Sequence, residues 1–280
     1  MTETVLAHVS DLHFGVHADL DQLDSLAPYL AEQRPSAVVI SGDLTQRARH
    51  GEFMAARLYL GLLEPIAPVL VMPGNHDVQW WASPFGLFGQ RAKYAKYRRY
   101  FGEDLTPVLQ TPGLVIAALL SSHGIAFGSL TWNPNDMGTI GHLPSREVER
   151  VRKVFADAPP DAVRVAVVHH NVVGGRLSRR MGLARWRTAQ RRLAALGAEL
   201  VLSGHDHEEA ASQIDGSLAV STAGTPTDRS RGNRPSAFNL VRIDERRIQI
   251  EHHLWDRPGH RFRRGTISAF ARKRAAESRA

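Results

Sequence analysis

Five short polar phrases, each placed at the end of an apolar run, constrain the fold of this chain more than any other feature of its sequence. They contain Asp, His and Asn and occur in the order Asp11-Leu12-His13, Gly42-Asp43, Gly74-Asn75-His76-Asp77, His169-His170 and Gly204-His205-Asp206-His207. Parallel strands of an α/β sheet carry the loops after their carboxyl ends to one edge of the sheet. We therefore expect the five phrases to meet in a single site.

The apolar runs themselves predict strands. Those rich in β-branched residues cover 5–9, 37–40, 69–72, 114–120, 163–168, 200–202, 218–220, 238–243 and 248–250. Several are too continuous for half-exposed strands, which favours sheets covered on both faces. Helical patterns lie between the earlier runs, at 20–32, 52–63, 145–155 and 188–196, and the last third is rich in strands. This order predicts an α/β fold with two mixed β-sheets flanked by helices.

The composition excludes several kinds of protein. The chain has no cysteine, which excludes disulfides, zinc-thiolate sites and a cysteine nucleophile. No apolar run approaches the roughly 20 residues that span a bilayer. The first residues show no basic segment followed by an apolar one, so a secretory signal is not expected. We therefore expect a soluble cytoplasmic enzyme.

The net charge of +7 is concentrated at the C-terminal end of the chain. Residues 257–280 contain eight Arg or Lys residues and one Glu, so this segment alone carries +7 and the remaining residues sum to zero. We predict a catalytic domain over residues 1–256 and a basic tail over 257–280. Such a tail is either solvated or in contact with an anionic membrane surface or a nucleic acid.

Residues 79–111 interrupt the alternation of strands and helices. This segment begins just after Asp77 and interleaves eight aromatic residues with five Arg or Lys residues. An aromatic and basic insertion beside a site can stack a base and neutralise phosphate, or contact lipid. The alternative is an amphipathic helix whose aromatic side chains pack on the body of the protein. An exposed insertion would also favour a homodimer.

The residue types in the phrases indicate a site for two metal ions. Asp, His and Asn form an oxygen and nitrogen ligand set that is large enough for two ions. Asp11 and His13 are two residues apart and therefore face the same side of an extended segment. Asp43 follows a glycine that permits a tight turn, and its two carboxylate oxygens can bridge two ions. The remaining donors are one amide and three imidazoles: Asn75, His169, His205 and His207.

Together the phrases resemble the motifs of the calcineurin-like metallophosphoesterases, which read D-x-H, G-D, G-N-H-D/E, H and G-H-x-H. Three phrases look most like those of the bacterial class III cyclic-nucleotide phosphodiesterases: Ser10-Asp11-Leu12-His13, Ser41-Gly42-Asp43-Leu44-Thr45 and Pro73-Gly74-Asn75-His76-Asp77. The resemblance runs from residue 5 to residue 225. It implies a four-layer αββα sandwich that holds two divalent metal ions.

The resemblance also implies a role for each residue. One ion would be bound by Asp11, His13, Asp43 and His207, and the other by Asp43, Asn75, His169 and His205. His76 would contact the substrate phosphate, with Asp77 orienting it. The ligand of the family is the first histidine after the strand, so His170 would support the ligands or line the substrate pocket.

The chain departs from the subfamily pattern at two positions. Asn171 stands where that subfamily often has proline, and Asp206 stands where its last motif commonly has a small or neutral residue. Neither change removes a predicted ligand, so the departures concern the substrate. A later loop could also reach the phosphate or base of a substrate and contains Thr225, Asp228, Arg229 and Arg231.

These residues predict a metal-dependent phosphodiesterase with a cyclic nucleotide as the expected substrate. Two ions about 3.5–4 Å apart generate hydroxide from a bridging water at neutral pH, and the hydroxide attacks phosphorus in line. His76 would donate a proton or hydrogen bond to the leaving oxygen. The ligand set suits manganese, iron, zinc or nickel.

Other functions fit parts of the sequence. A pyrophosphatase acting on a lipid-linked nucleotide at a membrane surface would use the aromatic insertion and the basic tail. Phosphomonoesterase activity is a further alternative. A nuclease is disfavoured because residues 1–256 carry no net charge. A binding scaffold without activity would lack metal ligands, whereas all seven predicted ligands are present.

Overall fold

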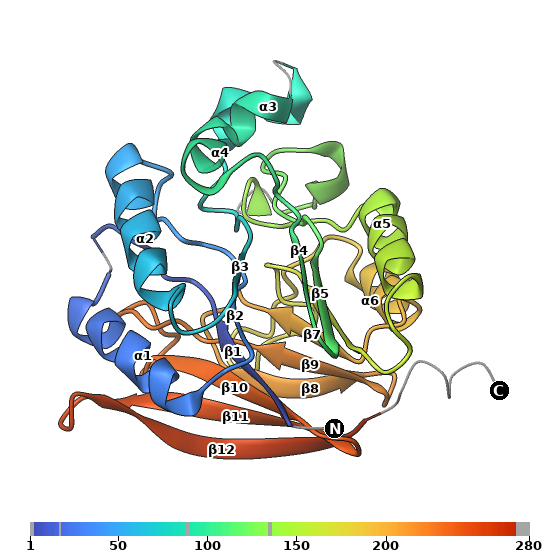
Figure 1. The fold of residues 1–280 in the computed structure, drawn as a ribbon. Helices are drawn as coiled ribbons and strands as arrows, with labels where there is room; N and C mark the ends of the chain where they lie inside the picture. Colours follow the sequence, from blue (N-terminus) through green and yellow to red (C-terminus); the bar gives the residue numbers. More distant parts are fainter. Residues whose placement is uncertain (1–2, 17, 88–89, 134–135, 273–280) are drawn as a thin grey trace.

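The computed structural model of the protein describes residues 3–16, 18–87, 90–133 and 136–272. Two six-stranded mixed sheets lie face to face with helices on their outer sides (Figure 1). The first sheet has the strand order β12-β11-β10-β1-β2-β3, and the second has the order β4-β5-β6-β7-β9-β8. The predicted αββα sandwich with two mixed sheets is therefore confirmed.

The strands follow the apolar runs of the sequence. The first sheet contains β1 (Thr4–Val9), β2 (Ala37–Ile40), β3 (Val69–Val71), β10 (Ala237–Ile243), β11 (Arg247–Asp256) and β12 (Arg261–Ala271). The second contains β4 (Val108–Thr111), β5 (Leu114–Ala118), β6 (Val163–Val167), β7 (Leu200–Ser203), β8 (Ala210–Ile214) and β9 (Leu218–Thr222). Strands β1 to β3 are parallel to one another, as are β5, β6, β7 and β9. The loops after the parallel strands of each sheet therefore reach one edge of that sheet.

Alternate side chains of each strand pack into different hydrophobic cores. In β1, Leu6 lies in the core between the two sheets, whereas Ala7 and Val9 pack towards the helices of the first sheet. Because strand side chains alternate between faces, a run in which every residue is buried contributes to two cores. The helices are α1 (Leu20–Gln33), α2 (His50–Leu63), α3 (Gln90–Lys93), α4 (Ala95–Phe101), α5 (Ser145–Ala156) and α6 (Trp186–Ala194).

The outer helix layers are built from amphipathic patterns in the sequence. Leu23, Leu26 and Leu30 of α1 recur at helical spacing and are fully or almost fully buried on the first sheet. Asp19 caps this helix, because its carboxylate accepts a hydrogen bond from the backbone N–H of Gln22 (3.2 Å). On the other side, Val151 and Phe155 of α5 pack on the second sheet.

The segment 79–111 contains both of the arrangements considered from its sequence. Tyr94 and Tyr97 are buried against the first helix layer. Lys93 is buried as well, and its Nζ donates to the carbonyl oxygens of His123 (2.9 Å) and Ile125 (3.1 Å). The short turns before them, η1 (Trp80–Ala82) and η2 (Pro84–Gly86), leave aromatic side chains exposed. Its last residues form β4 of the second sheet, and Phe88 lies outside the described residues.

The predicted basic tail differs from the structure over its first half. Residues 261–271 form β12, which pairs with β11 as the edge strand of the first sheet. Phe262 is buried against Phe238 and Trp255, and Arg272 forms a buried ion pair with Glu199. The boundary predicted after residue 256 therefore falls inside a hairpin, because backbone pairing and one buried ring hold a strand whose arginines face water. Residues 273–280 lie outside the described part of the chain.

In the described part of the chain, no helix has both the length and the apolar composition to cross a membrane.

Candidate metal centre

All seven predicted metal ligands lie at the carboxyl ends of parallel strands. Asp11 and His13 follow β1, Asp43 follows β2, and Asn75 follows β3 in the first sheet. The other three come from the second sheet: His169 follows β6, and His205 and His207 follow β7. The site is therefore formed where the edges of the two sheets meet.

The backbone is unusual at most of these residues. Asp11, His13, Asp43, His205 and His207 all have φ between 44° and 72°, a conformation that costs residues other than glycine about 1–3 kcal/mol each. Strained conformations of this kind gather at functional sites, because the surrounding structure holds them for a purpose other than stability. This clustering supports a functional role for the loops independently of the side-chain chemistry.

One group of donor atoms contains Asp11, His13, Asp43 and His207. Nε2 of His13 lies 3.7 Å from Oδ1 of Asp11 and 3.8 Å from Oδ2 of Asp43. Nε2 of His207 lies 3.3 Å from Oδ1 of Asp11 and 2.9 Å from Nε2 of His13. Two carboxylate oxygens and two imidazole nitrogens thus surround one point.

A second group of donor atoms forms on the other side of Asp43. Oδ1 of Asp43 lies 3.4 Å from Nε2 of His169. Oδ1 of Asn75 lies 3.0 Å from the same nitrogen and 2.9 Å from Nδ1 of His205. Asp43 therefore presents one carboxylate oxygen to each group, as a bridging ligand requires.

The donor atoms fit metal ions, because several of them are acceptors without a proton donor. Oδ1 of Asp11 is buried, and no hydrogen bond to it is found within the described part of the chain. Nδ1 of His207 donates to the carbonyl oxygen of Arg229 (3.0 Å), and Nδ1 of His169 donates to that of Ser41 (2.9 Å). Because Nδ1 carries the proton in both rings, Nε2 of each ring has a free lone pair that can bind a metal ion. Histidine ligands of metal proteins are oriented by hydrogen bonds of this kind.

The electrostatics of the pocket also favour positive charge. Burial opposes protonation of His169, but the carboxylates of Asp43 and Asp11 outweigh it and raise the pKa of His169 to about 9. Without a cation, Nε2 of His169 and Oδ1 of Asn75 would be two acceptors facing each other. Either a proton or a metal ion must lie between them, and metal binding would release that proton.

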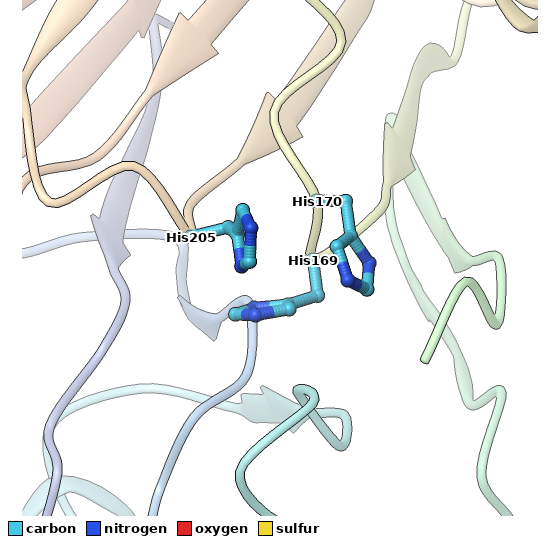
Figure 2. A group of neighbouring side chains, drawn as sticks. All are labelled: His169, His170 and His205. Carbon is cyan, nitrogen blue, oxygen red and sulfur yellow. The ribbon is translucent and has the colours of Figure 1, made fainter. Parts of the chain in front are cut away.

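His170 lies close to the second group, yet its ring nitrogens are already used. His169, His170 and His205 form a compact histidine cluster (Figure 2), in which the ring centroid of His170 lies 4.6 Å from that of His205 and 5.0 Å from that of His169. Nε2 of His170 donates to the carbonyl oxygen of Thr139 (2.9 Å), and Nδ1 contacts the hydroxyl of Ser121 (2.8 Å). This arrangement makes His170 a support for the ligand loop and leaves no ring nitrogen for a substrate.

The ring of His76 lies beside the first donor group. Its backbone N–H donates to Oδ1 of Asp43 (2.8 Å), and its Nδ1 donates to the carbonyl oxygen of Gln46 (2.7 Å). The ring meets that of His13 edge-on, with centroids 4.9 Å apart. Within the described part of the chain, no partner is found for Nε2 of His76.

Asp77 does not orient the ring of His76, in contrast to the expectation from the sequence. Its carboxylate accepts hydrogen bonds from the backbone N–H groups of Gly74, Leu44 and Thr45, and from the hydroxyl of Thr45. Burial and the neighbouring Asp43 raise the pKa of Asp77 to about 6. The physical reason is that Asp77 joins the loops after β2 and β3, whereas the backbone carbonyl of Gln46 holds the imidazole of His76.

Arg229 reaches the site from the loop after β9. Its Nη1 donates to Oε1 of Gln46 (2.8 Å) and lies 3.3 Å from Nδ1 of His13. No ion pair of Arg229 with a carboxylate is found within the described residues. Of the other residues considered in that loop, Thr225 bonds the backbone of Asp11, Asp228 pairs with Arg257 and Arg231 pairs with Asp206.

The two departures from the subfamily pattern both organise the loop after His170. Nδ2 of Asn171 donates to the carbonyl oxygens of Val173 and Arg180, both at 2.9 Å. Asp206 accepts a hydrogen bond from the hydroxyl of Ser178 (2.7 Å). Side-chain hydrogen bonds therefore shape a loop that a proline would otherwise restrict.

Comparison with known proteins agrees with this geometry. The family profile of the calcineurin-like phosphoesterases matches residues 4–209. This chain therefore belongs to the calcineurin-like phosphoesterase family. Over 83 residues it is 37% identical to the glycerophosphodiester phosphodiesterase GpdQ of Enterobacter lignolyticus, a match that covers 26% of this chain and 29% of that protein.

Two solved structures share the fold. A dimetal phosphatase from Danio rerio superposes with a TM-score of 0.65 and 11% identity over 96% of this chain and 99% of its own. The purple acid phosphatase PPD1 from yellow lupin superposes with a TM-score of 0.66 and 12% identity over 97% of this chain and 54% of its own. At such low identity, the likeness concerns the fold alone.

Proposed function

We propose that this protein is a phosphodiesterase that uses two divalent metal ions bound at the two donor groups. The observation that carries the proposal is the position of Asp43, whose two oxygens face separate groups of three further donors. The proposed ligands are Asp11, His13, Asp43 and His207 for one ion and Asp43, Asn75, His169 and His205 for the other. When bound, such a pair of ions supplies a hydroxide and neutralises charge on the phosphoryl oxygens.

The protein groups around the ions would bind and orient the diester. The backbone N–H of His76 binds Asp43 and its Nδ1 binds Gln46, so Nε2 is the ring nitrogen that can donate a proton or hydrogen bond to a substrate oxygen when protonated. Arg229 is a cation beside His13 that lacks a carboxylate partner in the described structure. Guanidinium groups bind phosphate and carboxylate through paired N–H donors, so we assign Arg229 to an anionic group of the substrate.

A cyclic nucleotide stays the substrate that we test first, within the broader class of phosphodiesters. The subfamily likeness of the motifs supports it, and the partial match to a glycerophosphodiester phosphodiesterase supports diester rather than monoester cleavage. The metals would be manganese, iron, zinc or nickel. A cytoplasmic location and a homodimer stay predictions from the sequence.

The test is a comparison of substrates after removal of metal. Chelator-treated protein should not hydrolyse bis(p-nitrophenyl) phosphate, and added Mn²⁺ should restore activity. The restored enzyme should prefer this diester and 3′,5′-cyclic AMP to p-nitrophenyl phosphate. Preference for the monoester would refute diester specificity, and bound metal without any turnover would favour a scaffold.

A pyrophosphatase acting on a lipid-linked nucleotide is a second candidate. Exposed aromatic side chains at η1 and η2 follow the third polar phrase directly and favour an amphiphilic substrate. Hydrolysis of a UDP-linked lipid faster than of any soluble diester would establish it.

A further inference from the structure

Eight large apolar side chains are exposed on two neighbouring segments, 80–87 and the described residues of 127–137, which are 127–133 and 136–137. We call them the apolar rim; they are Trp80, Trp81, Phe85, Leu87, Phe127, Leu130, Trp132 and Met137. Trp132 is fully exposed, and Phe127 and Leu87 are exposed to 75% and 74%. Single exposed apolar residues are normal, but a contiguous group of this size marks an interaction surface.

The two segments form one surface. The rings of Phe85 and Phe127 lie 4.9 Å apart, and the backbone N–H of Phe85 donates to the carbonyl oxygen of Ile125 (2.9 Å). Trp80 packs over Gly138, where an added Cβ would lie 3.4 Å from its ring. In Figure 1 these segments gather with α3 and α4 at one end of the molecule, away from β12.

Hydrogen bonds of Lys93 and Tyr94 fix the backbone next to the apolar rim. Lys93 ties α3 to the carbonyl oxygens of His123 and Ile125, and the hydroxyl of Tyr94 donates to the carbonyl oxygen of Ser122 (2.7 Å). The aromatic residues of α4 are packed inward, whereas those of the apolar rim are not. The side chains of the apolar rim are therefore exposed, although Tyr94 and Tyr97 of the segment 79–111 are buried.

Exposed arginines lie on the elements that adjoin the apolar rim. The two segments contain a single acidic residue, Asp136, and it is neutralised by an ion pair with Arg180. Arg91 lies exposed on α3, which follows the first segment. Arg176 and Arg179 lie exposed on the loop that contains Arg180, and the ion pair of Arg180 with Asp136 joins this loop to the second segment. Aromatic side chains with basic neighbours are typical of surfaces that lie in the interface of an anionic bilayer.

We propose that the apolar rim docks the protein onto a membrane surface that contains anionic lipid. The aromatic side chains enter the headgroup region, and the surrounding arginines contact lipid phosphates. A second copy of the chain fits less well, because a two-fold symmetric contact would set the same arginines against each other. The inference does not rest on the proposed phosphodiesterase activity, since docking requires neither metal nor turnover.

Docking would bring the candidate metal centre towards the lipid. Thr139 follows the second segment, and its carbonyl oxygen binds His170 beside the metal ligands. The segments of the apolar rim are thus continuous with the wall of the site. A membrane-bound protein would meet amphiphilic phosphoesters at this wall.

The experiment is sedimentation of the full chain with vesicles of phosphatidylcholine, with and without phosphatidylglycerol. We expect binding only when phosphatidylglycerol is present, and weaker binding as salt is raised, because salt screens the arginines. The double variant Phe127→Ser/Trp132→Ser should bind roughly tenfold or more weakly, given the apolar area that it removes. Arg91→Gln/Arg179→Gln should also weaken binding, by roughly fivefold for each arginine.

Matched controls lie elsewhere on the surface. Leu58 on α2 is 70% exposed, and Arg246 lies exposed in the turn before β11. Leu58→Gln and Arg246→Gln should bind vesicles like the parent protein. Equal binding by the parent and the Phe127→Ser/Trp132→Ser variant would overturn the proposal. So would a dimer in solution that this variant dissociates without any change in vesicle binding.

Discussion

Replacing Gly42 by alanine should damage the metal centre although no ligand is changed. Gly42 has a φ of 111°, and a Cβ there would lie 2.6 Å from Nδ1 of His169 and 2.8 Å from the backbone of Gly74. The backbone conformation costs alanine about 1–3 kcal/mol. Overpacking of this kind adds about 1–3 kcal/mol. The sum predicts a loss of about 2–6 kcal/mol in the free energy of unfolding.

The loop can relieve this strain by moving away from His169 and Gly74. Such a movement carries Asp43 with it and lengthens the 3.4 Å separation between Oδ1 of Asp43 and Nε2 of His169. Disturbing the supports of metal ligands typically weakens metal binding about 10–100-fold. Calorimetric titration with Mn²⁺ should show this loss, and the melting temperature should fall by about 4 °C or more.

Gly61→Ala is the matched control. Gly61 is exposed on α2, and nothing lies within 4 Å of a Cβ added there. Alanine at this helical position should stabilise the protein by about 1 kcal/mol and leave Mn²⁺ affinity unchanged. If Gly42→Ala binds Mn²⁺ as tightly as the parent and melts at the same temperature, the close approach of these loops does not organise the site.

The remaining predictions address single groups. His76→Ala should lower kcat for the diester about 10²–10⁴-fold while metal content, measured by atomic emission, stays at the parent value. Arg229→Gln should raise KM about tenfold with little change in kcat in steady-state kinetics, because it removes a charged hydrogen bond to the substrate. Removal of metal by chelator should lower the melting temperature, and added Mn²⁺ should restore it. Burial, aided by Arg234, lowers the pKa of His252 from 6.5 to about 4 in the folded protein. The unfolded chain therefore binds a proton at His252 more tightly than the folded protein does. Stability should therefore fall as the pH is lowered from 6.5 to 4, by about 3 kcal/mol for this group, and urea unfolding of His252→Gln should show a smaller loss.

The sequence predicted the layers and the ligand phrases because both depend on local pattern. A buried strand such as β2 must be apolar on both faces, and a residue that follows it reaches the sheet edge whatever the details of the loop. The meeting of Asp43 with Asn75 could therefore be anticipated from strand order alone, whereas the meeting of Asp43 with His169 depends on how the two sheets pack.

Contacts made by the backbone could not be predicted in this way. Gln46 holds His76 through its carbonyl oxygen, a group that every residue carries, so its side chain gives no signal. Asp77 was assigned to His76 from its neighbouring position, whereas its carboxylate binds three backbone N–H groups across two loops. The charge of β12 likewise concealed a strand that one buried ring, Phe262, and backbone pairing hold in place.

The origin of the ligands has a mechanical consequence. The candidate ligands on β1, β2 and β3 belong to the first sheet, and those on β6 and β7 belong to the second. Each donor group contains residues from both, so an ion bound in either group would tie the two halves of the sandwich together. Bound metal would then cross-link the two sheets where their edges meet, and one sheet could slide over the other only after the metal ions were released.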